Sequence, residues 1–505
     1  LAKFAYFRLT VKQPENTTVL NRQMGLIGLA ATGICSMLGA SIYVVPIMIQ
    51  RNVPGIGPWV LPAFLFASVP ALLAAISYAI LASAMPRAGG SYVYASRGLH
   101  PYLGFVASFS QWFGLCIAIG VVSYVIVPFF RDIAGALGAD TIAALLESGL
   151  IRLLLALALL WFFVWVNIRG VRFYERIIIP LMVLMFALGV LVIVAGFTFT
   201  HTDFATALQH RTGQQVPSGT AYFSLTTFLS AAAVLFSSFI GFDSIAQAGG
   251  EAQRPSRNMP LAIGIAITTV GGFYFVFTSA IYHAVPWQFV AAEANLHDVT
   301  APGLMTYLLP AGWTVAMVAG AAVALTNDLP AMLLSVSRLM FAWAEDGIFP
   351  QGITRTHPVH RTPVPALLIS GAVASLSILG CHFAGDFFLG IDILVTSMLV
   401  NFILMTITVM VLPRRNPAIA QDISVVRNRL AQWVLASAGL LALSAFLVIH
   451  VYKDLTASAG AWYSHATVIW IVVMLVASLI FFREIRRMKK AGRNVAAIFS
   501  ELPAA

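Results

Sequence analysis

Twelve long apolar runs leave this chain few alternatives to a helical membrane fold. Each is about 20 residues or longer, which is the length an α-helix needs to cross a bilayer. The runs cover residues 24–49, 57–84, 102–130, 149–167, 176–198, 222–247, 259–285, 311–343, 364–383, 387–412, 431–451 and 466–482. Only 10% of the residues are charged, against about 25% in soluble proteins. We therefore predict an all-α integral membrane protein with twelve transmembrane helices.

The basic residues predict how the chain is oriented. Of the 29 Lys and Arg residues, 24 fall in the tails and in alternate loops on one side of the predicted helices, and 5 fall on the other side. Because Lys and Arg gather on the cytoplasmic side of membrane proteins, we expect both termini in the cytoplasm of a multi-pass protein of the cell (inner) membrane. The net charge of +10 then faces the lipid bilayer, so no nucleic-acid partner is expected.

Two of the twelve runs are poor helices. The first, GLIGLAATGICSMLGASIYVVP, contains Gly33, Gly39 and Pro46, and the sixth, SSFIGFDSIAQAGGEAQRPSRNMP, contains Gly241 followed by Asp243. Glycine in a transmembrane helix often serves close helix packing. Interrupted helices at matching places in two five-helix halves, however, are typical of transporters built from inverted repeats. Backbone N–H groups freed by such a break can hold a carboxylate, and freed carbonyls can hold an ammonium or a metal cation.

Four segments in the expected order resemble the amino acid–polyamine–organocation (APC) superfamily. They are LGASIYVVP, MPRAGGSYVYASRGLHPYLGFVASFSQW, FIGFDSIAQAGGEAQRPSRNMPLAI and SRLMFAWAEDGIFPQGITRTHPVHRTPVPAL. The resemblance implies a LeuT-type fold with a 5+5 inverted repeat, broken helices 1 and 6, and two extra helices. It also implies alternating-access transport of amino acids or amines.

The implied fold divides the chain into six parts. They are a cytoplasmic tail 1–23, a first five-helix repeat 24–198, an extracellular linker 199–221, a second five-helix repeat 222–412, helices 11 and 12 in 413–482, and a cytoplasmic tail 483–505.

The resemblance also implies where a substrate would bind. In such transporters the carboxylate of an amino acid meets the break of the first helix, here Gly39, Ala40 and Ser41. The family usually has Gly-Ser-Gly-Ile-Phe there and this chain has Gly-Ala-Ser-Ile-Tyr, so the hydroxyl has moved by one position while backbone N–H donation is kept. The α-ammonium would lie against backbone carbonyls of the two breaks, those of Leu38, Ser237 and Ile240.

The third helix would face the substrate side chain with an apolar wall. Aligned through its glycine and tryptophan positions, it presents Gly114, Leu115, Ile119 and Val122. A wall without a partner for a second charge favours a neutral amino acid over Arg, Lys or Glu. Each of these residues taken singly could equally serve helix packing.

Asp243 is a further candidate for the substrate site, because it follows the break of the sixth helix. An acid inside the membrane is expensive and by default functional, so Asp243 could exchange a proton or contact an amine. Alternatively it caps the second half of the helix by accepting N–H groups freed by the break. A polyamine or other amine, held by Asp243 and Asp392, is the alternative substrate class.

The motif LTNDLPAM, residues 325–332, places two polar residues inside the eighth apolar run. By alignment, the resemblance implies that it faces the first helix at the place where sodium-coupled members of this fold bind their cation. The coupling site would comprise Cys35, Leu38, Ala324, Asn327 and Asp328. Pro330 lacks an N–H, so the carbonyl of Thr326 loses its helical partner and becomes available to a cation.

Two ions can occupy such a site. Asp328 can bind Na⁺ together with carbonyl oxygens, or it can take up a proton, and the remaining possibility is a neutral Asp328 that only packs. The fifth apolar run holds no lysine beyond its start that could neutralise Asp328. We therefore expect H⁺ as the coupling ion, with Na⁺ as the alternative and no other cofactor.

Other function classes find less support. An intramembrane enzyme needs a nucleophile with a base, or a metal cluster, on facing helices, and the sequence offers no such set. A channel needs a filter or ring-forming motif, which is also missing, while a sensor without flux remains open. We expect a secondary transporter, present as a monomer or homodimer, whose partners are the bilayer and a small amino acid or amine.

Overall fold

The computed structural model describes residues 20–296, 299–384, 388–457 and 464–503, and within them it contains helices but no β-strand. Residues 1–19 of the predicted N-terminal tail and residues 504–505 of the other tail lie outside the described part. The helices are α1 (Leu26–Leu38), α2 (Ala40–Asn52), η1 (Gly57–Trp59), α3 (Val60–Ala84), α4 (Gly90–Gly98), α5 (Pro101–Ala136), α6 (Asp140–Glu147), α7 (Gly149–Ile168), α8 (Val171–Thr198), α9 (His201–Thr212), α10 (Leu225–Leu235), η2 (Phe236–Phe239), α11 (Ser244–Gln247), α12 (Pro255–Ala284), α13 (Trp287–Leu296), α14 (Ala301–Met305), α15 (Ala311–Glu345), η3 (Gln351–Thr354), α16 (Val364–Ala384), α17 (Phe388–Arg415), α18 (Pro417–Gln421), α19 (Arg429–Thr456), α20 (Ala466–Lys490) and α21 (Val495–Ile498).

Twelve segments of the described chain are long and apolar enough to cross a membrane, which confirms the predicted all-α fold with twelve spans. Several helices extend past the predicted apolar runs, as α8 does at Val171 and α19 at Thr456, because a helix does not have to end where its apolar stretch ends. The first and sixth spans are interrupted, as predicted, whereas the repeat relation between 24–198 and 222–412 stays an expectation.

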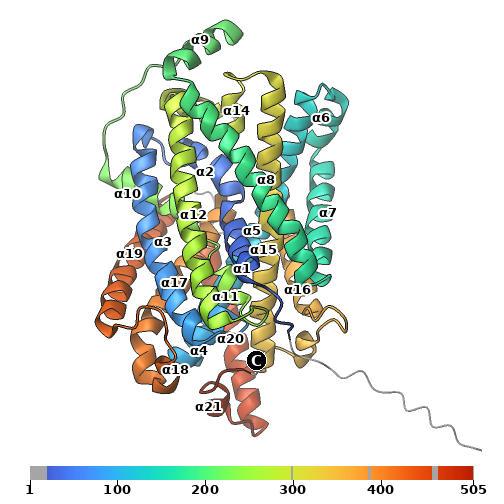
Figure 1. Cartoon of the computed structure of the whole chain (residues 1–505), viewed down its shortest axis with the longest axis vertical. Helices are drawn as coiled ribbons and strands as arrows, with labels where there is room; N and C mark the ends of the chain where they lie inside the picture. Colours follow the sequence, from blue (N-terminus) through green and yellow to red (C-terminus); the bar gives the residue numbers. More distant parts are fainter. Residues whose placement is uncertain (1–19, 297–298, 385–387, 458–463, 504–505) are drawn as a thin grey trace, which may run out of the picture.

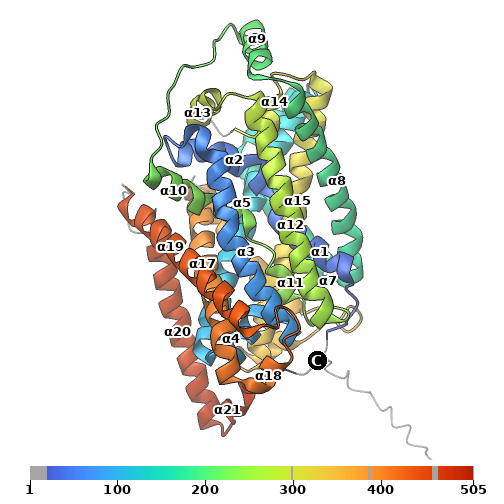
Figure 2. The same ribbon diagram turned by 60° about the vertical axis from the view of Figure 1, so that its left-hand side comes forward.

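The spans form an inner and an outer group (Figure 1). The apolar window of the first span is 100% buried and those of α15 and α17 are 83% and 72% buried, whereas only 22–28% is buried in α7, α8, α19 and α20. In Figure 2, α19 and α20 stand on the outside of the bundle. Their exposed apolar side chains, such as Leu441 and Leu479, are what a surface facing lipid requires.

Gly39 separates α1 from α2. Its backbone angles of φ −50° and ψ −127° leave the helical region, so the last carbonyls of α1 and the first N–H groups of α2 lose their partners within the helix. One of these carbonyls is satisfied from α12, where the hydroxyl of Tyr274 donates to the Met37 carbonyl at 2.6 Å. A side chain of a neighbouring helix thus satisfies a backbone carbonyl that the break in the first span leaves without a helical partner.

The sixth span breaks after η2. Ile240 is extended and Gly241 has a φ of 137° before α11 begins at Ser244, a backbone conformation that is essentially restricted to glycine. A Cβ placed on Gly241 would overlap the backbone carbonyl of Ser36 in α1. The two breaks therefore touch, with backbone packed on backbone.

Both described ends of the chain meet the loop that follows α3. Ala88 of this loop clusters with Leu20 and Phe341, and the Arg87 Nε donates to the Pro503 carbonyl at 2.9 Å. The two ends thus lie at the same end of the bundle, called here the α21 end, opposite the α9 end (Figure 1). Which side of a membrane each end faces stays a prediction.

The predicted linker 199–221 is not all loop. It contains α9, whose first turn is fixed by a capping box in which the Thr200 hydroxyl and the Asp203 carboxylate each accept a backbone N–H from the other residue. The spacing of Thr200 and Asp203 is the sequence signature of such a helix start. The sequence prediction assigns this segment as an extracellular linker and names no helix in it, because the segment lacks a long apolar run.

We expect Gly241→Ala to destabilise the protein, because alanine at this φ costs about 1–3 kcal/mol and its Cβ would overlap the Ser36 carbonyl. The melting temperature of the purified protein in detergent should fall. The matched control is Gly264→Ala in α12, where an added Cβ meets nothing within 4 Å. An unchanged melting temperature for Gly241→Ala would mean that the contact between the two breaks carries little of the stability.

Candidate functional site

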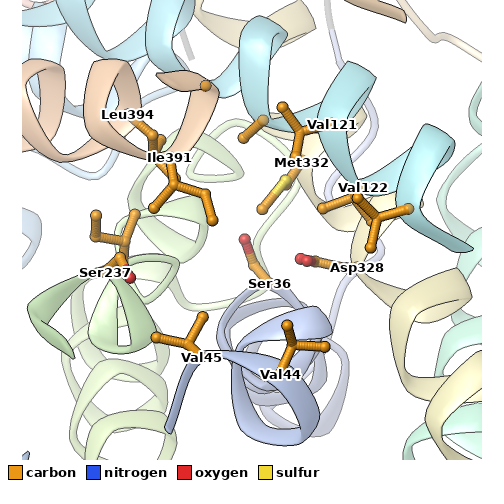
Figure 3. A pocket seen from close by; sticks show the side chains of 14 residues that line it. Ser36, Val44, Val45, Val121, Val122, Ser237, Asp328, Met332, Ile391 and Leu394 are labelled. Atoms are coloured by element: carbon orange, nitrogen blue, oxygen red, sulfur yellow. The ribbon is translucent and has the colours of Figure 1, made fainter. Parts of the chain in front are cut away.

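A cavity lies between the first span and its neighbours at the level of the two breaks (Figure 3). The centres of water-sized spheres fit into about 60 Å³ of it, and part of the surrounding space is open to solvent. It is lined by Ser36, Val44, Val45, Ala118, Val121, Val122, Val125, Ser237, Ile240, Asp328, Met332, Gly390, Ile391 and Leu394. These residues come from α1, α2, α5, the broken sixth span, α15 and α17.

The lining is chemically one-sided. Among the lining residues that the structure describes, Asp328 is the only ionisable one, Ser36 and Ser237 add two hydroxyls, and all the others are aliphatic residues, methionine or glycine. Figure 3 shows the oxygens of Ser36 and Asp328 pointing toward the same space from α1 and α15, with the apolar side chains around it. The cavity therefore offers one polar corner and an aliphatic wall.

Asp328 lies in the polar corner against the break of the first span. Its side chain is buried, with 4% exposed, and a Cβ added to Gly39 would overlap its carboxylate. Gly39 is also the residue from which α2 begins, and no side chain caps that helix. The carboxylate thus lies at the positive end of the α2 dipole. Its Oδ1 atom has no hydrogen-bond partner in the described part of the chain.

Asn327 points away from the cavity. Its side-chain amide donates to the Cys35 Sγ at 2.8 Å and to the Ile178 carbonyl of α8 at 3.3 Å, while its Oδ1 has no partner in the described chain. The structure therefore brings Cys35 and Asn327 together between the first, fifth and eighth spans, at the predicted coupling site. Asp328 is directed from the same stretch of α15 toward the cavity.

Asp243 belongs to a separate buried network. Its carboxylate accepts the Gly241 N–H at 3.0 Å and the side-chain amide of Gln111 in α5, and Gln111 in turn accepts from Ser91 at 2.5 Å and from Gln247 at 3.1 Å. Asp243 does not cap α11 and does not line the cavity. It accepts an N–H freed by the break, so its oxygens are occupied by groups that fix the sixth span to α5.

The other predicted site residues lie around the cavity. Ser237 and Ile240 line it, and so does Val122 of the predicted α5 wall. Gly114 instead packs closely against Ser397 of α17. The remaining residues with described side chains, Leu38, Leu115, Ile119 and Ala324, are buried and absent from the lining, while the side chains of Ala40 and Ser41 lie outside the described part.

Several lining residues were missed by sequence reasoning. Met332 could have been found, because it is four residues from Asp328 and so shares its helix face. Ser36 precedes the break by one helical turn, and its hydroxyl bonds with that of Ser244 at 2.9 Å across the two broken spans. Ile391 and Leu394 come from α17, and no motif marks them.

A buried ion pair closes the α21 end below the breaks. Arg338 of α15 holds Glu251 through two bonds, Nη2 to Oε1 at 2.5 Å and Nε to Oε2 at 3.0 Å, and both side chains are buried. The Glu251 carbonyl also accepts the Met24 N–H at 2.9 Å. The segments flanking the two broken spans are thus tied to α15.

A second pair lies nearer the surface of the same end. Arg97 of α4 binds both oxygens of Asp346 at 2.6 and 2.8 Å, and the Tyr92 hydroxyl donates to the same carboxylate at 2.5 Å. Burial and the neighbouring carboxylate hold the pKa of Tyr92 well above its usual range, so the hydroxyl stays a donor. Arg97 also donates to the carbonyls of Ile498 and Glu501.

The geometry suits a cationic ligand better than a resident metal. In the part of the chain that the structure describes, no group of three or more His, Cys, Asp and Glu side chains could hold a metal ion. The cavity instead combines an unpartnered carboxylate oxygen on Asp328 with an unpartnered hydroxyl on Ser237 and an aliphatic wall. These groups can accept from an ammonium and bury an apolar body.

Comparison with known proteins gives one family match over most of the chain. The model of the family described as "Amino acid permease" matches residues 24–478. The chain is also 29% identical to cationic amino acid transporter 4 of Mus musculus over 398 residues, which is 74% of this chain and 58% of the mouse protein. It thus spans less than two thirds of that relative's length.

For two bacterial relatives, the match covers similar shares of this chain and of the relative. The branched-chain amino acid permease BcaP of Bacillus subtilis (strain 168) is 25% identical, over 71% of this chain and 74% of its own. The low-affinity putrescine importer PlaP of Escherichia coli (strain K12) is 25% identical, over 67% of this chain and 69% of its own.

We expect Glu251→Gln to lower the free energy of unfolding by about 3–5 kcal/mol, because it leaves the buried Arg338 guanidinium without its counter-charge. Thermal or denaturant unfolding of the purified protein measures the loss. Glu484→Gln is the matched control, since Glu484 pairs with Arg487 at 3.5 Å on the surface, where such a pair contributes at most about 0.5 kcal/mol. Equal losses in the two variants would contradict a special role for the buried pair.

Proposed function

Because the chain belongs to the amino acid permease family, we propose that it is a secondary active transporter that moves small amino acids or amines across a membrane by alternating access. The family and the relatives above are membrane permeases, so the chain is a transporter and not an enzyme. The substrate class we propose carries a single positive charge and an apolar body. Neutral amino acids and apolar monoamines both belong to this class.

The observation that carries this proposal is the lining of the cavity. The names of the relatives include cationic and branched-chain amino acids and putrescine, so family membership leaves the substrate side chain open. The lining holds one carboxylate, on Asp328, and no second acid. A second positive charge on a substrate would be buried without a partner, at a free-energy cost of several kcal/mol. An aliphatic or aromatic group would be buried favourably against the wall.

Alternating access requires the α21 end to open. In the structure this end holds the buried Glu251–Arg338 and Arg97–Asp346 pairs, and the cavity lies at the level of the breaks, beside the start of α2. Transport would break and re-form these pairs around a cavity whose lining stays in place. The ground state would therefore have the α21 end closed.

We further propose that Asp328 couples transport to protons. An ionised, unpartnered carboxylate inside a membrane protein costs several kcal/mol, so Asp328 must be neutralised by a proton or by a bound cation whenever the cavity closes. The lining provides no basic residue for this purpose. Na⁺ is the alternative ion, and the Asn327 Oδ1 atom, which lacks a partner in the described chain, could contribute an oxygen only after Asn327 turned toward Asp328.

The substrate class can be tested by uptake into proteoliposomes that contain only this protein. We expect the better of leucine and 3-methylbutylamine to be preferred at least about tenfold, in uptake or in competition, over each of arginine, putrescine and spermidine. The expected order follows from the single carboxylate of the lining. Saturable transport of putrescine or arginine, with no response to the compounds that carry one charge, would refute it.

Proton coupling can be tested by comparing a pH gradient without sodium with a sodium gradient at equal pH. We expect the uptake of the best substrate of the panel to follow the pH gradient, and Asp328→Asn to abolish that response. Protein-free liposomes are measured in parallel, since neutral amines cross lipid unaided.

The matched control for Asp328→Asn is Asp454→Asn. Asp454 is another buried acid, but its oxygens accept the Ala466 and Thr467 N–H groups at 3.0 and 2.8 Å and it does not line the cavity. This variant should keep the response to the pH gradient. Uptake that needs sodium and ignores the pH gradient would contradict proton coupling.

A further inference from the structure

The start of α2 is the natural anion position of the cavity. Where a helix begins at a break, its first N–H groups lack partners and the helix dipole adds partial positive charge. α2 is 13 residues long, begins directly after Gly39 and has no capping side chain. A carboxylate brought by a substrate would be expected at this position.

In this chain a protein carboxylate already lies there. A Cβ on Gly39 would overlap the Cγ and Oδ2 atoms of Asp328, so the carboxylate of Asp328 lies directly against the residue from which α2 begins. The position is buried, because Asp328 is 4% exposed. A second carboxylate at the start of α2 would lie beside that of Asp328, and two like charges in one buried site repel each other.

The other side of this carboxylate faces the cavity. Asp328 lines it, and its Oδ1 atom has no hydrogen-bond partner in the described chain. The hydroxyl of Ser237 is likewise buried, unpartnered and part of the lining. No Lys, Arg or His lies among the lining residues that could hold a second anion. The polar corner therefore accepts an ammonium and has no place left for a carboxylate.

The balance of charge selects among ligands that carry an ammonium. A primary monoamine neutralises Asp328 and leaves the filled cavity with no net charge. A zwitterionic amino acid leaves one uncompensated negative charge, and a diamine leaves one uncompensated positive charge beside an aliphatic wall. Uncompensated charge at a buried position is expensive, so the monoamine is the ligand that this site binds best.

We propose that Asp328 supplies from the protein the carboxylate that an amino acid substrate would otherwise bring, so that the cavity binds primary monoamines with an apolar body and no carboxylate. The ammonium contacts the Asp328 Oδ1 atom, and the Ser237 hydroxyl is a further acceptor in the lining. The apolar body lies against the aliphatic side chains contributed by α2, α5 and α17. This proposal rests on the proposed function, because it assumes that the cavity is the transport site.

Equilibrium binding to the purified protein in detergent tests the proposal without interference from amine diffusion through lipid. The ligands are matched pairs that differ only in the carboxylate, leucine with 3-methylbutylamine and phenylalanine with 2-phenylethylamine. Leucinamide, which keeps the α-ammonium and carries a neutral amide in place of the carboxylate, separates charge from size. We expect the two amines to bind at least about tenfold more tightly than the amino acids, with leucinamide closer to the amine.

Asp328→Asn should invert this order. Removing the charge should weaken binding of 3-methylbutylamine at least about tenfold, while binding of leucine is kept or strengthened because its carboxylate no longer meets a like charge at the start of α2. An unfolded variant could not show the second effect. Asp454→Asn should keep the order of the unaltered protein.

The outcomes separate the two proposals. Leucine binding as tightly as 3-methylbutylamine to the unaltered protein, or an unchanged order in Asp328→Asn, overturns the monoamine proposal and leaves an amino acid transporter. Failure of all five ligands to bind the folded protein overturns the proposed function, and the monoamine proposal with it.

Discussion

Backbone groups inside a membrane protein must find hydrogen-bond partners within the protein, and the two broken spans depend on this constraint. Lipid offers no partner for a free N–H or carbonyl, so a break is tolerated only where other protein groups surround it. Here Tyr274 donates to the Met37 carbonyl, Asp243 accepts the Gly241 N–H, and Ser36 bonds with Ser244 across the two spans. The positions of α12, α5 and α15 around the breaks follow from that need, and so does the cavity that they enclose.

The two buried acids near the breaks have different surroundings and therefore different uses. Asp243 has both oxygens occupied, by the Gly241 N–H and by Gln111, and it connects the sixth span to α5. Asp328 keeps one oxygen without a partner in the described chain and turns it to the cavity. An acid whose hydrogen bonds are complete stabilises a conformation, whereas an acid with an unpartnered oxygen can still accept a hydrogen bond from a ligand.

Sequence patterns predicted the fold well, because apolar length and glycine position are local properties. The twelve spans and the interruptions at Gly39 and Gly241 can be seen directly in the chain. The residues that line the cavity were harder to predict from the sequence. Ser237, Ile240, Val122 and Asp328 were among the residues considered and do line it, but α17 contributes Ile391 and Leu394 through a packing contact that no local signal marks. The separation of Asp328 from Asn327 depends on helix rotation, which sequence spacing leaves undetermined.

The close approach of Gly39 to Asp328 links two positions that are almost 300 residues apart in the sequence. A larger residue at position 39 would have to displace the Asp328 carboxylate. A smaller neutral residue at position 328 would leave room for a side chain at position 39. Neither substitution is neutral on its own, and each alters what the other position tolerates. The first and the eighth span are therefore fitted to each other at this one contact.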